Sequence, residues 1–181
     1  MTDEAARLED CSRTCGCCGE PRRGVPDYAF RRPDAVVARG DGAVLHVDSN
    51  DLCDVEANGA RRVFLRGVLL IPLRAIPGQS FGYGPWVEVQ RDDARRYVQA
   101  TRDGDVGALA PLPATLANDL PGCEGTTGLP VALRGQPNGQ RPSIDAAVAS
   151  PHRLAAEQRD GWDAARLRAV LADGPFCRGT A

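Results

Sequence analysis

The chain has 181 residues, of which 43% are hydrophobic and only 5% aromatic, and its formal net charge is −2. This length suits one domain, residues 1–181, with a core built mainly from aliphatic side chains. The slightly negative charge argues against a general nucleic-acid or anionic-membrane partner. All 22 basic residues are arginine, a residue suited to bidentate contacts with anions. No run approaches the ~18 apolar residues that cross a bilayer.

The N-terminus, Met1-Thr2-Asp3-Glu4, is acidic, whereas a signal peptide begins with a basic region followed by an apolar stretch. We therefore expect a cytoplasmic location, where thiols stay reduced and clustered cysteines indicate metal or redox chemistry. The chain has seven cysteines, an odd number that cannot all pair with one another.

Residues 11–34 are rich in Cys, Gly, Pro and Arg without a clear period, which predicts an irregular segment that needs an external clamp. Within it, Cys15-x-x-Cys18-Gly19 has the spacing that lets two thiolates bind one zinc ion, as in a zinc knuckle. A closed structural site needs four ligands, and no second Cys-x-x-Cys exists. The candidates for the other two positions are Cys11, Cys17, His46, Cys53, Cys123, His152 and Cys177. Unligated thiols and a redox pair remain alternatives.

Residues 43–148 are expected to form a sheet. Strands are predicted at 43–47, 52–56 and 62–66, the last two joined by Asn58-Gly59, the strongest short hairpin signal. The stretch 67–73 continues as a buried strand, with 86–90 as its antiparallel return.

A helix is predicted over 92–102, and residues 104–128, with three prolines, are predicted to be a loop. A second hairpin joins 129–134 to 143–148 through Pro137-Asn138-Gly139. Two helices, 151–159 and 162–172, complete a C-terminal part spanning 151–173. The apolar stripe of the last helix predicts that it docks on the sheet; the stripe comprises Trp162, Ala165, Leu167, Val170 and Leu171. The predicted class is α+β: a mainly antiparallel sheet, C-terminal helices packed on it and an irregular Cys-rich N-terminal segment.

Gly78-x-Ser80-x-Gly82 matches the nucleophile-elbow pattern of hydrolases, and Ser80, Asp145 and His152 have a suitable order for a triad. The elbow needs a helix directly after the serine, and the Gly- and Pro-containing residues that follow instead favour a glycine-rich loop between strands. His152 follows Pro151 at a predicted helix start, where capping is the simpler role. Trp86 is expected in the core.

An ordered set of short motifs covers nearly the whole chain. It comprises Cys15-x-x-Cys18-Gly19, Val25-Pro26-Asp27-Tyr28-Ala29-Phe30, Asp51-Leu52-Cys53, Phe64-Leu65-Arg66-Gly67-Val68-Leu69-x-Ile71-Pro72, Gly82-x-Gly84-x-Trp86-Val87, Thr126-x-x-Leu129, Arg141-Pro142-x-Ile144 and His152-x-Leu154-Ala155-x-Glu157-Gln158-x-x-Gly161. This set resembles the bacterial domain-of-unknown-function family twenty-one ninety-nine. The resemblance implies an architecture and no reaction. Arg22 stands where family members carry a His, four residues after the second knuckle Cys.

We therefore predict a zinc-stabilised protein with Cys15, Cys18, Cys53 and His152 as the metal ligands. Its expected role is a binding or interaction module for a protein partner or a small molecule. The alternative is a small metal- or Cys-dependent enzyme acting on a small molecule, since Arg13, Arg22 and Arg23 flank the cysteine cluster and cations lower the pKa of thiols. An antitoxin-like or immunity protein is a third possibility, and no catalytic residue is assigned.

Overall fold

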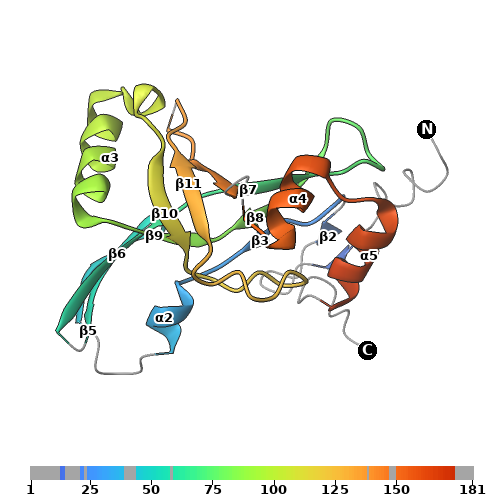
Figure 1. The fold of residues 1–181 in the computed structure, drawn as a ribbon, viewed down its shortest axis with the longest axis horizontal. Coiled ribbons are helices and arrows are strands. Elements are labelled where there is room, and N and C mark those ends of the chain that lie inside the picture. Colours follow the sequence, from blue (N-terminus) through green and yellow to red (C-terminus); the bar gives the residue numbers. More distant parts are fainter. Residues whose placement is uncertain are drawn as a thin grey trace.

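The computed structural model of the chain describes residues 13–14, 21–22, 24–38, 44–57, 59–137, 139–146 and 150–173. A seven-stranded sheet, in the order β12-β11-β10-β9-β6-β5-β4, is antiparallel at every pairing (Figure 1). Its strands are β4 (Val44–Asp48), β5 (Leu52–Ala57), β6 (Ala60–Arg66), β9 (Trp86–Val89), β10 (Leu112–Leu116), β11 (Pro130–Arg134) and β12 (Ser143–Ala146).

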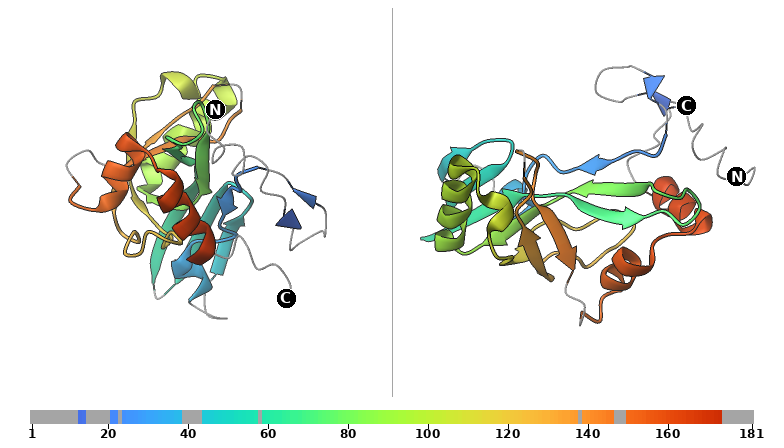
Figure 2. Two further views of the ribbon diagram at one scale, coloured as in Figure 1. Left: turned by 90° about the vertical axis from the view of Figure 1, so that its right-hand side faces the viewer. Right: turned by 90° about the horizontal axis from the view of Figure 1, so that it is seen from above.

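A three-stranded sheet has the order β3-β8-β7, with β3 (Tyr28–Ala29) parallel to β8 (Ser80–Gly84) and β7 (Leu69–Pro72) antiparallel to it. The two-residue strands β1 (Arg13–Thr14) and β2 (Pro21–Arg22) pair with each other. The helices are α2 (Asp34–Val37), α3 (Arg91–Asp103), the 3-10 turn η2 (Val106–Ala108), α4 (Arg153–Asp160) and α5 (Ala164–Asp173). Helix α3 lies at one end of the fold, and α4 and α5 lie at the other, beside β7 and β8 (Figures 1 and 2). The predicted α+β class is confirmed.

Both predicted hairpins are present. Strands β5 and β6 pair up to Ala57 and Ala60, and Gly59 has the positive φ of 73° that a tight hairpin turn requires. Strands β11 and β12 pair from Arg134 and Ser143. The sequence therefore located the hairpins correctly toward both ends of the large sheet.

The pairing predicted for 67–73 and 86–90 is wrong. Strand β7 pairs with β8, whereas β9 pairs with β6 and β10. The chain leaves the large sheet at Gly67 and returns at Pro85, where the Gly67 N–H donates to the Pro85 carbonyl at 3.0 Å. A Cβ at Gly67 would lie 2.7 Å from the Ile144 side chain, so this crossing between sheets needs glycine. The glycine-rich loop expected at Ser80 is consequently strand β8.

Strand β10 was also missed, because its stretch was predicted as a loop on account of its prolines. Leu112, Ala114 and Leu116 alternate inward and are buried, the pattern of a half-buried strand. Pairing with β9 covers Ala114–Leu116 only, so at Pro113 the strand pairs only with β11. Proline lacks a backbone N–H, and it is tolerated at such a position because no hydrogen bond to a second neighbouring strand is lost there.

The apolar stripe of the last helix packs as predicted, with one exception. Trp162, Leu167, Val170 and Leu171 are buried, whereas Ala165 is exposed and Ala164 is buried instead. The Trp162 ring lies 5.1 Å from Phe81 and 6.1 Å from Tyr83, centroid to centroid, on the small sheet. Trp162, which precedes α5 and bridges to Leu73, therefore packs on the small sheet, and Leu167, Val170 and Leu171 of α5 join the main core.

A buried amide joins the segment before α2 to the large sheet. Asn118 is fully buried, and its Oδ1 accepts the Trp86 N–H at 2.8 Å. Its Nδ2 donates to the Arg32 carbonyl at 2.9 Å and to the Asp34 carboxylate at 2.7 Å. Each of these groups would be left without its partner if the amide were removed.

We expect Asn118→Ala to lower the free energy of unfolding by about 3 kcal/mol, because the buried Trp86 N–H loses its partner and the half-buried Arg32 carbonyl and Asp34 carboxylate each lose a hydrogen bond. Urea denaturation followed by circular dichroism measures this change. Asn50→Ala is the matched control, since Asn50 is exposed, and should change stability by less than about 0.5 kcal/mol. Equal effects of the two substitutions would contradict the structural role of Asn118.

Candidate functional site

The residues predicted to bind zinc are only partly within the described structure. Cys15 and Cys18 lie outside the described residues. Cys53 is fully buried on β5 in a small cluster with Val55, Phe64 and Trp86. Burial, and then the charge of Asp48, raise the pKa of its thiol. This environment favours a neutral thiol over a zinc-binding thiolate.

His152 is the N-cap residue of α4, as the capping interpretation predicted. Its Nδ1 accepts the Leu154 N–H at 3.2 Å, and its Nε2 lies 3.0 Å from the Glu124 carbonyl oxygen, to which it donates. Both ring nitrogens therefore have protein partners. Strand β5 and helix α4 lie at opposite ends of the fold (Figures 1 and 2), so Cys53 and His152 are not brought together. Over the described ranges no three His, Cys, Asp or Glu side chains form a group that could hold a metal ion.

The residues of the hydrolase-like pattern are also separated by their contacts. Ser80 begins strand β8 and is exposed, and the residues after it are strand rather than the helix that an elbow needs. Asp145 pairs with Arg134 on the neighbouring strand β11. His152 is committed to the cap of α4.

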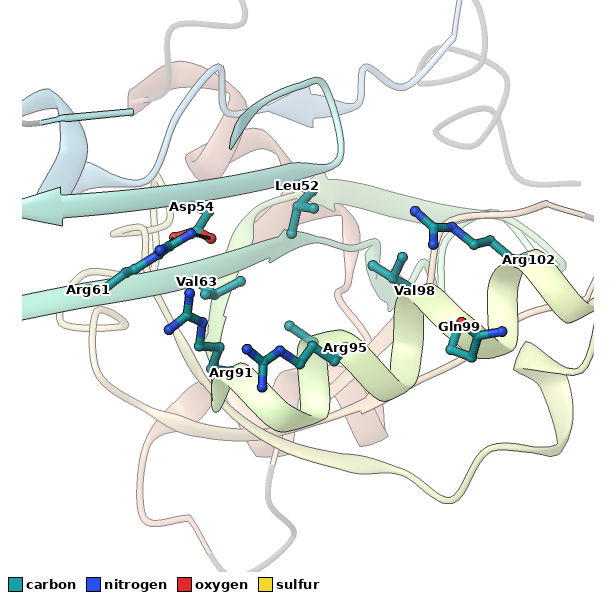
Figure 3. Close-up of a pocket in the computed structure, with 10 residues that line it drawn as sticks. Leu52, Asp54, Arg61, Val63, Arg91, Arg95, Val98, Gln99 and Arg102 are labelled. Carbon is teal, nitrogen blue, oxygen red and sulfur yellow. Dashed lines mark hydrogen bonds and ion pairs between the residues drawn. The ribbon is translucent and has the colours of Figure 1, made fainter. Parts of the chain in front are cut away.

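A cavity rich in charged side chains lies between α3 and the large sheet. The hollow has a volume of about 380 Å³. Its strand side is formed by Leu52, Asp54, Arg61 and Val63, and its helix side by Arg91, Ala94, Arg95, Val98, Gln99 and Arg102 (Figure 3). We call this the arginine pocket.

The composition of α3 explains why a hollow exists there. A helix docks on a sheet through an apolar stripe, but in α3 only Ala94 is buried. The face toward β5 and β6 interleaves Ala94 and Val98 with Arg91, Arg95 and Arg102. Long cationic side chains hold the helix away from the strands, and Leu52 and Val63 are left as an apolar floor.

Asp54 and Arg61 form the most rigid part of the pocket. The Arg61 Nε and Nη2 donate to the two Asp54 carboxylate oxygens, each at 2.7 Å, in a bidentate pair. This hydrogen bonding is the main cause that lowers the pKa of Asp54, with Arg91 and His46 contributing through charge. Asp54 therefore stays ionised at neutral pH and fixes the guanidinium of Arg61 at the pocket wall.

The remaining arginines are poorly neutralised. Arg95 pairs at 3.0 Å with Asp92, an exposed partner one turn away. In the part of the chain that the structure describes, Arg91 and Arg102 have no hydrogen-bond or ion-pair partner. Figure 3 shows both side chains extending from α3 toward the strands. Four arginines against one carboxylate make this hollow strongly positive on a chain whose net charge is −2.

Sequence reasoning did not single out these arginines. The available signal was their spacing, because Arg91, Arg95, Val98 and Arg102 stand at i, i+4, i+7 and i+11, on one face of the predicted helix. The strand-side half of the pocket had no comparable signal, since Asp54 and Arg61 meet only through the β5–β6 register.

The second described cysteine outside the N-terminal segment is Cys123, which lies under α4. Its Sγ is 3.8 Å from a Glu157 carboxylate oxygen and is fully buried. Burial is the main cause that raises the pKa of Cys123 to about 11, against lowering by Arg153 and Arg166. A thiol with this pKa is almost entirely protonated at neutral pH and is a poor nucleophile.

We expect Cys53 and Cys123 to react with iodoacetamide far more slowly than a free thiol at pH 7.5, and at the ordinary rate once the chain is unfolded. Mass spectrometry of peptides after timed labelling measures each cysteine separately. The same digest from urea-treated protein is the control. Rapid labelling of Cys123 in the folded protein would show that its thiol is exposed or ionised.

No helix among the described residues is both long and apolar enough to cross a membrane.

Three comparisons with known proteins bear on the identity of the chain. No curated protein and no solved structure is significantly similar to the chain. A family model described as an uncharacterised protein conserved in bacteria (DUF2199) matches residues 14–162, most of the chain and all of both cavity-lining strands and α3. The chain therefore belongs to this bacterial family, as its motifs predicted.

Proposed function

We propose that this protein is a binding module that holds a small phosphorylated molecule in the arginine pocket. The observation that carries the proposal is the set of four arginines around a hollow that contains a single carboxylate, already paired with Arg61. Arginine forks donate pairs of N–H groups to phosphate oxygens, and several together match a group with more than one negative charge. The apolar floor suits the organic part of such a ligand.

The position of Arg91 supports a role beyond stability. Arg91 is the first residue of α3, where the positive end of the helix dipole disfavours a cation. Asp92 and Asp93 are the favourable charges in this turn. A cation kept at an unfavourable position, without a partner among the described residues, is accounted for by a ligand anion that binds both it and the helix end.

The pocket chemistry supports binding rather than catalysis. Its lining includes no Ser, Cys, His, Tyr or Lys. Its one carboxylate, Asp54, has a lowered pKa because of Arg61, so it is a weak base. The small metal- or Cys-dependent enzyme considered from the sequence gains no support from this pocket. The charge is concentrated in one hollow on an acidic chain, which favours a small molecule over a nucleic acid.

We expect inorganic pyrophosphate to bind the protein with an affinity that falls as salt is raised, because the contacts are electrostatic. Arg91→Gln and Arg102→Gln should each weaken binding about tenfold, the value of one charge-assisted contact. Isothermal titration calorimetry at two ionic strengths measures both effects. Arg91→Gln should leave stability unchanged or slightly raised, since it removes a cation from the helix start.

Arg96→Gln is the matched control for this experiment. Arg96 is on the same helix, pairs with Asp93 at 2.9 Å and does not line the pocket. This variant should bind pyrophosphate like the unaltered protein. If Arg96→Gln and Arg91→Gln weakened pyrophosphate binding equally, the binding would depend only on the total charge of α3, and the pocket proposal would be overturned.

We also propose that Cys15 and Cys18 bind zinc and clamp the N-terminal segment. The support is their spacing and a segment with little apolar periodicity to hold it. Cys53 and His152 are the further ligands expected from the sequence. Their contacts favour other residues in these two positions, because Cys53 is a buried neutral thiol and His152 caps α4 through Nδ1 and donates to the Glu124 carbonyl through Nε2.

We expect one zinc ion per chain by elemental analysis, lost in the double variant Cys15→Ser, Cys18→Ser. A chelator should lower the melting temperature of the unaltered protein and leave that of the double variant unchanged, because only the former has metal to lose. Cys53→Ala tests whether Cys53 is one of the further ligands. If this variant still holds one zinc ion per chain, Cys53 is not a zinc ligand. Metal-free protein with an unaltered melting temperature would contradict the zinc proposal as a whole.

A further inference from the structure

A second cavity lies on the other flank of α3. Its volume is about 400 Å³. Its apolar wall includes Val106 and Pro142, and its polar side chains are Asp51, Arg66, Tyr97, Thr101, Gln140 and Arg141. Helix α3 thus separates this cavity, lined by its residues 97, 101 and 104, from the arginine pocket, lined by its residues 94, 98 and 102.

Arg66 is the unusual group in this second cavity. It is half-buried at the end of β6, with its guanidinium carbon 6.0 Å from the centre of the Trp86 ring. Its two hydrogen bonds are long, 3.4 Å each, and go to the neutral carbonyls of Gly84 and Asn50. Among the described residues no carboxylate forms an ion pair with it. Most of its N–H donors therefore have no partner in the part of the chain that the structure describes.

The surroundings of Arg66 raise the free-energy cost of keeping its guanidinium charged. Loss of water is the first cause that lowers the pKa of Arg66, and Arg141 and Arg32 lower it further by repulsion. Asp51 opposes this lowering of the Arg66 pKa, but its carboxylate is already bound to the Arg141 Nε at 2.6 Å. A partly buried guanidinium without a counter-ion gains most from a single added negative charge.

We infer that this second cavity binds the carboxylate of a small organic acid, with Arg66 as its counter-ion. One planar anion satisfies the fork of Arg66, and the Tyr97 and Thr101 hydroxyl groups line the same cavity. Only one cation there lacks a partner, and Asp51 repels further negative charge, so a monocarboxylate fits better than a phosphate. The apolar tail lies against Val106 and Pro142. This site is separate from the arginine pocket and does not depend on it.

Trp86 provides an internal reporter for this site. The chain has two tryptophans, Trp86 beside Arg66 and Trp162 near α5. The Trp162 Nε1 is buried without a hydrogen-bond partner in the described structure, so Trp162→Phe removes no such bond. Trp162→Phe therefore leaves Trp86 as the only tryptophan, and its fluorescence reports an anion arriving at Arg66.

The test is to titrate the Trp162→Phe protein with sodium butyrate, sodium acetate and inorganic phosphate, holding ionic strength constant with chloride. We expect a saturable change in Trp86 fluorescence with butyrate, a weaker one with acetate, which lacks the longer tail, and none with phosphate. Adding Arg66→Gln should weaken butyrate binding at least about tenfold. Tyr97→Phe keeps the packed ring and removes only the hydroxyl, so it tests the cavity without altering Arg66; we expect weakening of about threefold.

The outcomes separate this inference from the arginine pocket. Arg102→Gln, added to the Trp162→Phe protein, should leave the butyrate response unchanged, because Arg102 lines only the first pocket. Phosphate binding as tightly as butyrate would overturn the carboxylate assignment. A response that grows linearly with every salt, or that survives both Arg66→Gln and Tyr97→Phe, would overturn the site itself.

Discussion

The buried amide of Asn118 is the interaction on which the arrangement of the two sheets depends. It binds the N–H of Trp86, where the chain re-enters the large sheet, and the segment Arg32–Asp34 on the other side. The Trp86 Nε1 donates to the Phe30 carbonyl at 3.2 Å, so the same segment is held twice. Trp86 also lies beside Arg66, which lines the second cavity, so this network fixes the ring against which that arginine lies. Buried polar groups that are fully satisfied specify one arrangement, since any shift leaves them unpaired.

Helix α3 has the opposite character. It buries only Ala94 fully, and on both of its flanks the side chains that face the sheet surround a cavity. A helix with this little apolar contact gains less from packing than α5, whose Leu167 and Val170 are fully buried. Local charge pairs, Asp92 with Arg95 and Asp93 with Arg96, supply part of the difference. This low packing gain agrees with the proposed ligand-binding role of the arginine pocket, since binding sites are often kept at some cost in stability.

The sequence predicted the features whose signals are local. The Asn58-Gly59 turn, the α3 pattern and the His152 cap each depend on a few adjacent residues, and each is confirmed. The errors concern long-range choices. Gly67 and Pro85 send two strands into a second sheet, and no periodicity records which partner a strand selects. The cavities were missed for the same reason, because Asp54, Arg61 and α3 meet only through strand register and helix placement.

The predicted metal ligands illustrate how composition can mislead about distance. Cys53 and His152 were selected because cysteine and histidine are the usual zinc ligands and because both stand in motifs that the family resemblance rests on. Neither residue type nor motif says which end of the fold a residue occupies, and simpler physical roles explain both side chains. Cys53 is a small apolar residue in the cluster under Trp86, and His152 accepts the Leu154 N–H at the start of α4.

The arginines gave no such signal in the sequence. Every basic residue of the chain is arginine, so those that line the cavities looked like ordinary surface residues. They became informative only when missing partners distinguished Arg66, Arg91 and Arg102 from arginines such as Arg61 and Arg62 that already hold a carboxylate. For this fold, the presence or absence of a counter-ion locates candidate sites better than residue type does.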